Sequence, residues 1–291
     1  MNTRERLLRG LAIILVLTVV GIGAFWTQWF LTGSHLSATP ECYRIFENTF
    51  PLPDALLAAL LLATAGLLWQ RKMAVLYFGG LAGGMLLYLA ALDGLYNLQH
   101  TQFAFDAEPP GMVMLPLVLY LLVLAGTLFT ALLLARDAVT DEDAPLPAPG
   151  AMAGLTMLAA IYAAITAAYW IYHFAQSAPD NAQPCLAAFH QAFYLADATT
   201  LVTLSLALAG SMRGRRWGLP FATSTCGGIL FGTMNYTLFA LQNPTRIDGN
   251  ETAYVLLILL FLTAIGYALV TLWRNRGFWL MGEGAWRIDM L

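Results

Sequence analysis

The sequence has little charge, a single lysine and no motif for metal binding or thiol redox chemistry. Charged residues make up 11% of the 291 residues and hydrophobic residues 59%, whereas soluble domains have roughly 25% charged residues. A net charge of −3 provides no basic surface, so we expect no nucleic-acid partner. The three cysteines include no CxxC pair and no Cys/His cluster, which argues against zinc binding and against an adjacent-pair thiol relay. This composition indicates an integral membrane protein, with the lipid bilayer as its partner.

Long apolar runs alternate with short polar segments along the whole chain. Each of eight runs is long enough to cross a hydrocarbon core of about 30 Å. The first run follows several arginines but has no cleavage site of small residues after it, so it indicates a spanning helix and not a signal peptide. The predicted segments are residues 10–31, 52–70, 74–98, 112–136, 151–174, 193–212, 217–241 and 252–274. The predicted fold class is an all-α polytopic membrane protein with eight transmembrane helices.

Residues 42–99 recur at 185–242 without a gap. Under this shift Cys42 aligns with Cys185 and Asp54 aligns with Asp197. Matched cysteines and aspartates are informative because such residues are scarce in this chain and intramembrane acids are costly to keep. The sequence therefore predicts an internal repeat.

The repeat divides the chain into two halves around a linker. Residues 1–136 are the first predicted four-helix repeat, and 151–291 are the second, with a short tail. Residues 137–150 are acidic and rich in proline and alanine, as expected of a linker. Because four helices return the chain to its starting side, we expect the repeats to be parallel and related by an axis along the membrane normal.

The basic residues are distributed unevenly between the two membrane faces. If the segments alternate, Arg44 and Arg246 are on one face, and the other arginines with Lys72 are on the opposite face. The positive-inside rule then places both termini and the linker in the cytoplasm. We expect an inner (plasma) membrane location.

Two predicted helices contain glycines at small-xxx-small spacing. Gly79 to Gly84 supplies two such pairs, and Gly228 with Gly232 supplies one in the matching helix. This spacing is typical of close helix packing in lipid, and we interpret it in that way.

Six titratable residues converge on the non-cytoplasmic face of the predicted bundle. Asp197 precedes Arg213 by 16 residues, which places it about 24 Å from the inner interface. The same reasoning places the others near the outer interface. The predicted ligand-binding residues are Glu47, Asp54, Asp93, His173, His190 and Asp197.

Each aspartate has a structural alternative. Asp54 follows Pro53 near a helix start, where a carboxylate caps free N–H groups and favours the helix dipole. Asp197 lies within a run that looks helical from Cys185 onward, so capping explains it less well. The two aspartates differ in this respect. Pro51 and Pro53 can interrupt the helix before Asp54, whereas the second repeat has no proline at the matching positions before Asp197.

Three chemistries are open to this set of acids and histidines. A divalent metal would suit carboxylates with imidazole, but the sequence has no HxxxH or ExxH pair, and we predict no metal site. Haem bound by His173 and His190 rests on two histidines alone. A protonatable pocket for a cationic or hydroxylated ligand, or for protons, needs only acids in apolar surroundings and is preferred. The cofactor stays unknown.

Aromatic residues lie at the same level as the acids. Trp26, Trp29, Tyr169 and Trp170 belong to this set. The simplest interpretation is an interfacial belt, and the alternative is a pocket wall that stacks on a ligand.

Cys42 and Cys185 are predicted to form a disulfide between the halves, because they occupy equivalent positions on the face where an oxidising compartment preserves disulfides. Such a bond would bring Asp54 and Asp197 together. Cys226 is expected to stay reduced and buried.

These features favour a membrane protein that binds or transports a small-molecule or lipid-like ligand, with an outward-facing acidic/His pocket between the halves. The first alternative is a membrane-embedded enzyme that uses carboxylates for acid/base chemistry on an apolar substrate. The second is a non-catalytic subunit of a membrane complex. Transport would need a polar path to the cytoplasm. In the inner halves of the segments predicted at 52–70 and 193–212, only Thr64, Thr203 and Ser205 are polar, which argues against a wide aqueous path.

Overall fold

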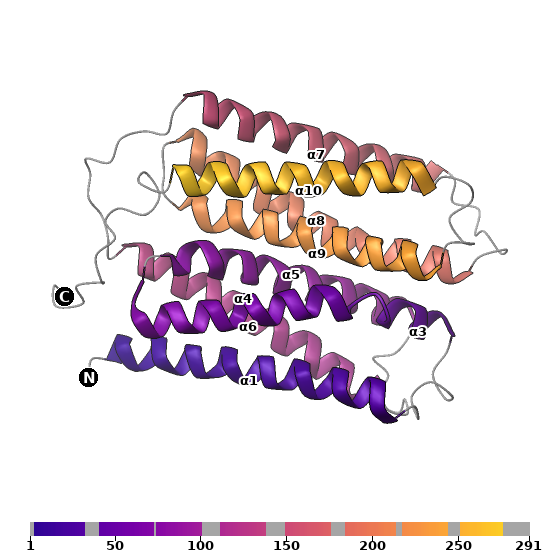
Figure 1. Ribbon diagram of the computed structural model, residues 1–291, viewed down its shortest axis with the longest axis horizontal. Helices are drawn as coiled ribbons and strands as arrows, with labels where there is room; N and C mark the ends of the chain where they lie inside the picture. The colour runs from indigo at the N-terminus through magenta and orange to yellow at the C-terminus, as the bar shows by residue number, and fades with distance from the viewer. Residues whose placement is uncertain are drawn as a thin grey trace.

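A computed structural model of the chain shows a bundle of long helices (Figure 1). It describes residues 3–32, 41–72, 74–100, 111–137, 149–175, 184–213, 217–243 and 251–275. The helices in these ranges are α1 (Thr3–Thr32), α3 (Glu41–Glu47), α4 (Pro51–Gln70), α5 (Val75–Gln99), α6 (Gly111–Asp137), α7 (Pro149–Ala175), α8 (Pro184–Met212), α9 (Gly218–Gln242) and α10 (Glu251–Arg274). Most bounds agree with the predicted segments to within a few residues, because long apolar runs fold as helices that satisfy their own backbone hydrogen bonds. Most of the predicted linker lies outside the described residues.

Proline explains the main difference between matching helices. In the first half, α3 ends at Glu47, and α4 begins at Pro51, whose missing N–H suits the first turn of a helix. In the second half, α8 runs without a break from Pro184 and so begins nine residues before the predicted segment at 193. The predicted interruption of the helix at Pro51 and Pro53 is therefore confirmed, as is the uninterrupted helix around Asp197.

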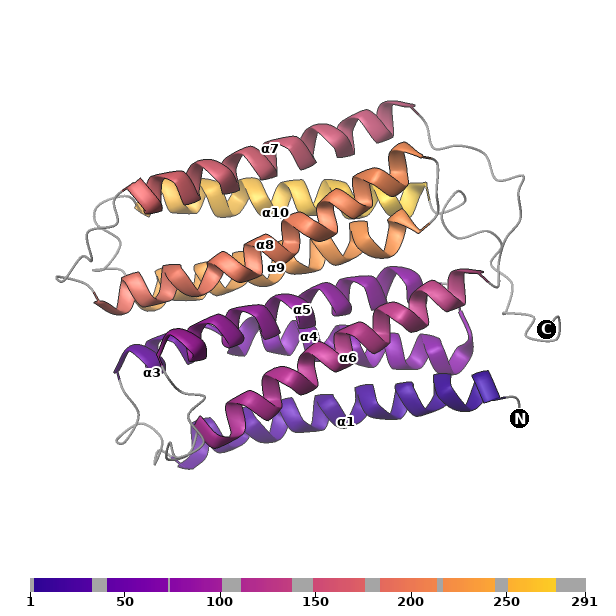
Figure 2. The ribbon, with the colours of Figure 1, turned by 180° about the vertical axis from the view of Figure 1, so that it is seen from behind.

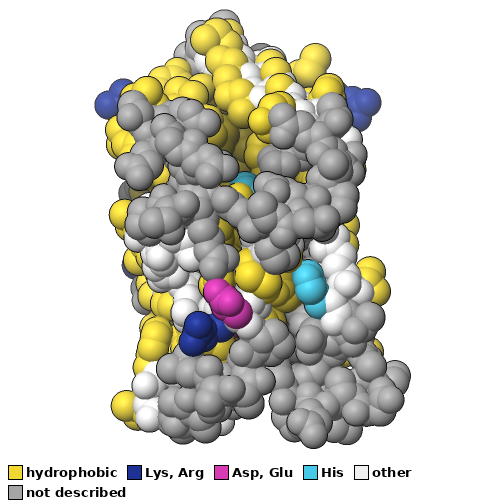
Figure 3. All heavy atoms as spheres, turned by 90° about the vertical axis from the view of Figure 1, so that its right-hand side faces the viewer, with side chains coloured by type: hydrophobic (Ala, Val, Ile, Leu, Met, Phe, Trp, Pro, Cys, Tyr) yellow, Lys and Arg dark blue, Asp and Glu magenta, His cyan; other side chains and the backbone are white. Residues whose placement is uncertain are grey.

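Seven helices among the described residues are long and apolar enough to cross a membrane. They are all the long helices except α9, which has a run of threonine, serine and glycine from Thr223 to Gly228. Large hydrophobic side chains such as Leu17, Val123 and Leu256 are exposed on the bundle, and hydrophobic side chains line much of its flanks when it is viewed along the helices (Figure 3). Exposed apolar surface of this extent indicates a lipid bilayer around the protein. The chain is a multi-pass all-α membrane protein.

The helices of each half lie together, and the halves meet along α5 and α9. Helices α1, α3, α4, α5 and α6 form one side of the bundle, and α7 to α10 form the other (Figures 1 and 2). Helix α5 packs against α9 and α8, and α4 also contacts α9. Helix α1 begins, and α10 ends, at the same end of the bundle (Figure 1).

Glycines allow α5 and α9 to touch backbone to backbone. A Cβ added at Gly84 would lie 1.9 Å from the carbonyl oxygen of Ser224, and one at Gly227 would lie 2.2 Å from that of Leu81. A Cβ at Gly80 would lie 1.9 Å from the hydroxyl of Thr223. Close approach of this kind is what the small-xxx-small spacing around Gly84 predicted.

Each half contains a stacked aromatic pair, and the two pairs occupy matched sequence positions. Phe46 stacks on Tyr96 with ring centroids 3.9 Å apart, and Phe189 stacks on Phe239 at 4.0 Å. The members of the second pair are each 143 positions after those of the first. Both pairs are buried and join the helix that carries the predicted acid to the helix at the centre of the bundle.

Candidate functional site

A disulfide joins the two halves at one end of the bundle. Cys42 in α3 and Cys185 in α8 are bonded, with their Cα atoms 4.7 Å apart. The predicted disulfide is thus confirmed, and Cys226 is free and buried, as expected. The bond anchors the segments that lead to the predicted acids.

Three acids of the first half are buried near this end. Glu47, Asp54 and Asp93 are each less than one-tenth exposed, and they interact electrostatically with one another. The indole N–H of Trp26 donates to Asp54 Oδ2 at 2.9 Å, whereas Asp54 Oδ1 is buried without a hydrogen-bond partner. Tyr43 hydrogen-bonds Glu47. We call Glu47, Asp54 and Asp93 the acid cluster.

No basic residue in the described part of the chain forms an ion pair with the acid cluster. The ion pairs among the described residues both involve Glu5, which binds Arg9 and Arg71 near the start of α1. Helix α4 has no side-chain cap at its N-terminal residue Phe50, and the carboxylate of Asp54 accepts its hydrogen bond from another helix. Asp54 thus lies in the first turn of α4, where the helix dipole favours a carboxylate, but its hydrogen bond does not cap that helix.

Asp197 has a related environment in the second half. The indole N–H of Trp170 lies 3.4 Å from Asp197 Oδ2, and the hydroxyl of Tyr88 donates to Oδ1 at 2.9 Å. Asp54 and Asp197 therefore each accept from a tryptophan of the first helix of their own half. Only Asp197 also receives a hydroxyl from the opposite half, from α5.

Gly228 and Gly232 make room for that hydroxyl. A Cβ at Gly232 would lie 2.5 Å from the Tyr88 oxygen, and one at Gly228 would lie 3.4 Å from its ring. Gly232 thus accommodates the Tyr88 side chain and Gly228 chiefly the Thr200 hydroxyl, 2.8 Å from an added Cβ, whereas Gly84 accommodates a backbone.

His190 belongs to a second hydrogen-bonded group. It is buried, and its Nδ1 lies 2.5 Å from the hydroxyl of Tyr169 and 3.2 Å from that of Tyr236. The two hydroxyls are 2.7 Å apart. We call His190, Tyr169 and Tyr236 the His–Tyr group. The side chain of His173, also predicted for the site, lies outside the described residues.

The predicted site residues fall into two groups. Asp54 and Asp197 share no hydrogen-bond partner: the first belongs with the acid cluster, and the second lies with Tyr88 and Trp170. At repeat-equivalent positions, Glu47 matches His190 and Asp93 matches Tyr236. Within the described part of the chain, no group of three or more His, Cys, Asp or Glu residues is arranged to hold a metal ion.

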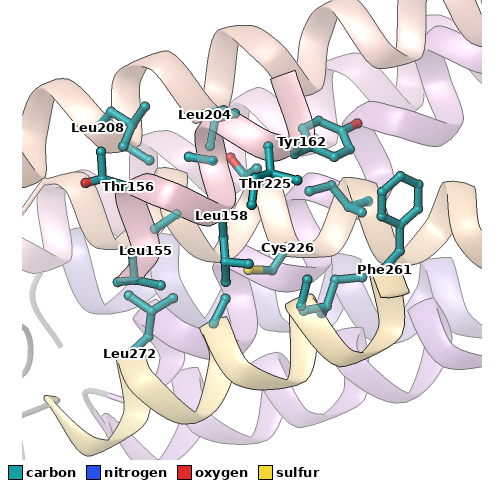
Figure 4. A pocket seen from close by; sticks show the side chains of 18 of the residues that line it. Leu155, Thr156, Leu158, Tyr162, Leu204, Leu208, Thr225, Cys226, Phe261 and Leu272 are labelled. Carbon is teal, nitrogen blue, oxygen red and sulfur yellow. The ribbon is translucent and has the colours of Figure 1, made fainter. Parts of the chain in front are cut away.

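An apolar cavity lies inside the second half, between α7, α8, α9 and α10 (Figure 4). Its volume is about 140 Å³, and it is open on one side. Leu155 and Leu272 lie at one end, and Tyr162 and Phe261 lie at the other (Figure 4). None of the six predicted site residues lines it.

The residues at two matched positions differ where this cavity lies, although the first half has a separate hollow between α1 and α4. In the first half, Gly79 and Gly83 allow Leu132 and Phe129 of α6 to pack within 3.4 Å of where a Cβ would lie. The matched residues, 143 positions later, are Ala222 and Cys226, and both line the cavity. Larger side chains on α9 keep the neighbouring helices apart.

Sequence reasoning missed the partners of the aspartates. Trp26 and Trp170 were assigned to an interfacial belt, but their N–H groups donate to the predicted acids. Tyr88 and Tyr162 were not singled out. A usable signal was present, because a tryptophan precedes each aspartate by a nearly equal interval, 28 residues and 27 residues.

The fold and these buried polar groups define a multi-pass helical membrane protein with two polar groups near its disulfide-bonded end and an apolar cavity in one half. The chain matches no protein-family model, no curated protein and no solved structure.

Proposed function

We propose that this membrane protein binds a small ligand that carries a cationic or hydroxylated group, at the polar residues beside the disulfide. The ligand-binding residues are Glu47, Asp54, Asp93, His173, His190 and Asp197. The acid cluster and the His–Tyr group are the two unlike faces of one outward-facing site between pseudo-symmetric halves.

The two halves are parallel four-helix repeats in this proposal, and α9 is an eighth spanning helix. Recurrent contacts support the repeat: Gly84 meets Ser224 as Gly227 meets Leu81, and these residues exchange under the shift of 143. Helices α5 and α9 are each 25 residues long and pack together along the centre. Burial there explains how α9 tolerates its threonines in a membrane.

The disulfide-bonded end faces away from the cytoplasm, and both termini are cytoplasmic. The excess of arginine at the opposite end supports this orientation. Disulfides persist in oxidising compartments such as the periplasm, so the Cys42–Cys185 bond supports the same orientation.

One observation carries the proposed function: the carboxylate of Asp54 is buried, and one of its oxygens accepts no hydrogen bond. A buried carboxylate is costly unless a positive partner or a full set of donors accompanies it. Glu47 and Asp93 beside it add like charge. A bound proton or a cationic group would relieve this cost, which is the reason for the proposed ligand chemistry.

Binding is better supported than an open transport path. Towards the other end of the bundle, Thr64 and Ser205 donate to carbonyls of their own helices, and Thr203 donates to Thr200 of its own helix. Hydroxyls committed in this way do not line a hydrated channel. The acids and His190 of the proposed site therefore belong to the disulfide-bonded end, whereas the buried polar residues towards the other end, such as Thr223 and Ser224, carry no charge.

Replacement of each aspartate by its amide tests the proposal. Purified Asp54→Asn and Asp197→Asn variants would be titrated with a fluorescent alkylammonium and with the matched uncharged alcohol. We expect Asp54→Asn to weaken binding of the ammonium by at least about tenfold, since about 1.4 kcal/mol corresponds to a factor of ten. Glu5→Gln, at the opposite end, is the matched control and should bind normally.

Thermal unfolding of the same variants separates binding from structure. Asp197→Asn should reduce binding of either probe far more than it lowers the melting temperature. Normal binding by both variants, or loss of binding only in step with loss of folding, would show that the acids are structural.

A further inference from the structure

We propose that the cavity between α7, α8, α9 and α10 holds the hydrocarbon chain of a lipid-like molecule, whose hydroxyl or amine head lies beside Tyr162. The polar end of this inference rests on the proposed ligand-binding function, whereas the apolar end rests on the cavity itself.

The walls of the cavity suit a hydrocarbon chain. Most lining side chains are leucine, isoleucine, alanine or phenylalanine. Thr225, one of the polar exceptions, already donates to Thr203 and to the carbonyl of Phe221. Water needs two to four polar partners to occupy a cavity, and these walls offer few. Apolar walls with so few polar partners therefore favour a chain of methylene groups over water.

The surroundings supply such a chain. Helices α7 and α10 form outer walls of the cavity, and their other faces expose large apolar side chains such as Met157, Ile171 and Leu259. Helix α7 packs more loosely on α8 than α1 packs on α4. A lipid chain can therefore enter from the bilayer between loosely packed helices.

The two ends of the cavity differ in chemistry. Leu155 and Leu272 form one end, whereas Tyr162 lies at the other (Figure 4). The Tyr162 hydroxyl hydrogen-bonds Thr166 and Thr200 and interacts electrostatically with Asp197. A molecule with its chain in the cavity would thus present its polar head to the end nearest Asp197. This arrangement selects an amphiphile over a purely apolar solute.

Photochemical labelling tests the chain site. The probe is a long-chain alcohol with a diazirine near the end of its chain, added to the full protein in vesicles of phosphatidylcholine. Peptides from α7, α9 and α10 should be labelled. Ala268→Phe fills the cavity from α10, and it should lower labelling by about tenfold because the ring takes the volume of the chain.

Val270→Phe is the matched control, since Val270 is on the same helix but exposed to lipid. It should leave labelling unchanged. Ala264→Leu, a milder change at another lining position, covers the case in which Ala268→Phe fails to fold, as judged by its melting temperature.

The outcomes separate this inference from the proposed function. Labelling that persists in Ala264→Leu and folded Ala268→Phe, or that falls equally in Val270→Phe, would overturn the chain site. Cavity labelling in Asp54→Asn and Asp197→Asn that equals wild type would support the chain site even if those variants showed no defect in binding the polar probes.

Discussion

The two aspartates at repeat-equivalent positions have unequal partners. Asp54 and Asp197 each accept from a tryptophan, but only Asp197 also accepts from Tyr88. The residue that matches Tyr88 in the second half is Phe231, which has no hydroxyl to offer. The unsatisfied Asp54 Oδ1 is thus accompanied by the loss of a donor at the equivalent position. A single oxygen atom distinguishes a satisfied acid from one that still needs a partner.

Tyr88→Phe should destabilise the protein by about 1–3 kcal/mol, because Asp197 would lose its closer donor while staying largely buried. Equilibrium unfolding in mixed detergent micelles measures the change. Tyr267→Phe removes a hydroxyl from an exposed tyrosine and should have little effect. Equal stability of the two variants would show that the bond between Tyr88 and Asp197 contributes nothing.

Helices α5 and α9 depend on glycine in two different ways. At Gly84 and Gly227 the opposite backbone occupies the space of a side chain, whereas at Gly232 the Tyr88 side chain occupies it and at Gly228 the Thr200 hydroxyl does. A stripe of small residues therefore serves both helix packing and the placement of a polar side chain. Spacing alone does not distinguish these uses.

Gly84→Ala should separate α5 from α9, since its Cβ would lie 1.9 Å from a backbone oxygen that cannot move aside. We expect a loss of at least about 3 kcal/mol, at the upper end of the usual cost of overpacking. Gly126→Ala, where nothing lies within 4 Å, should instead gain about 0.5–1 kcal/mol from helix propensity. The free energies of unfolding of both variants decide the matter. A Gly84→Ala protein as stable as wild type would contradict the backbone contact.

The molecule as a whole combines similar halves with different interiors. In the first half, α6 packs onto Gly79 and Gly83, and a hollow lies between α1 and α4. In the second half, a cavity lies beside Ala222 and Cys226. The disulfide, and the close packing of α5 on α9 at Gly84 and Gly227, hold the two halves together. The cavity between α7, α8, α9 and α10 therefore has space for a ligand that is specific to the second half.

Thiol labelling tests the orientation of the whole molecule. In wild type, alkylation before reduction should modify only Cys226, and alkylation after reduction should modify all three cysteines. In a Cys185→Ser, Cys226→Ser variant, the released Cys42 should react with a membrane-impermeant maleimide added to intact cells, because it lies at the end we place outside. Lys72→Cys in a cysteine-free background is the control and should react only after lysis. The opposite pattern would reverse the orientation.

Much of the architecture follows from the sequence alone. Apolar length determines the helices, since a chain in lipid must satisfy its backbone groups within each segment. Proline determines the break before α4 and its absence determines the continuous α8. The matched cysteines predicted the disulfide, because equivalent residues near an axis between halves can approach each other.

Only the tertiary structure decided which partners the buried groups have. Trp26 reaches Asp54, and Tyr88 reaches Asp197 from the opposite half, and neither pairing follows from helical periodicity. The cavity likewise depends on how closely α7 and α10 approach α9, which a difference of one or two carbon or sulfur atoms at Ala222 and Cys226 changes. Helix formation is a local property of the chain, whereas packing distances depend on side chains that are far apart in sequence.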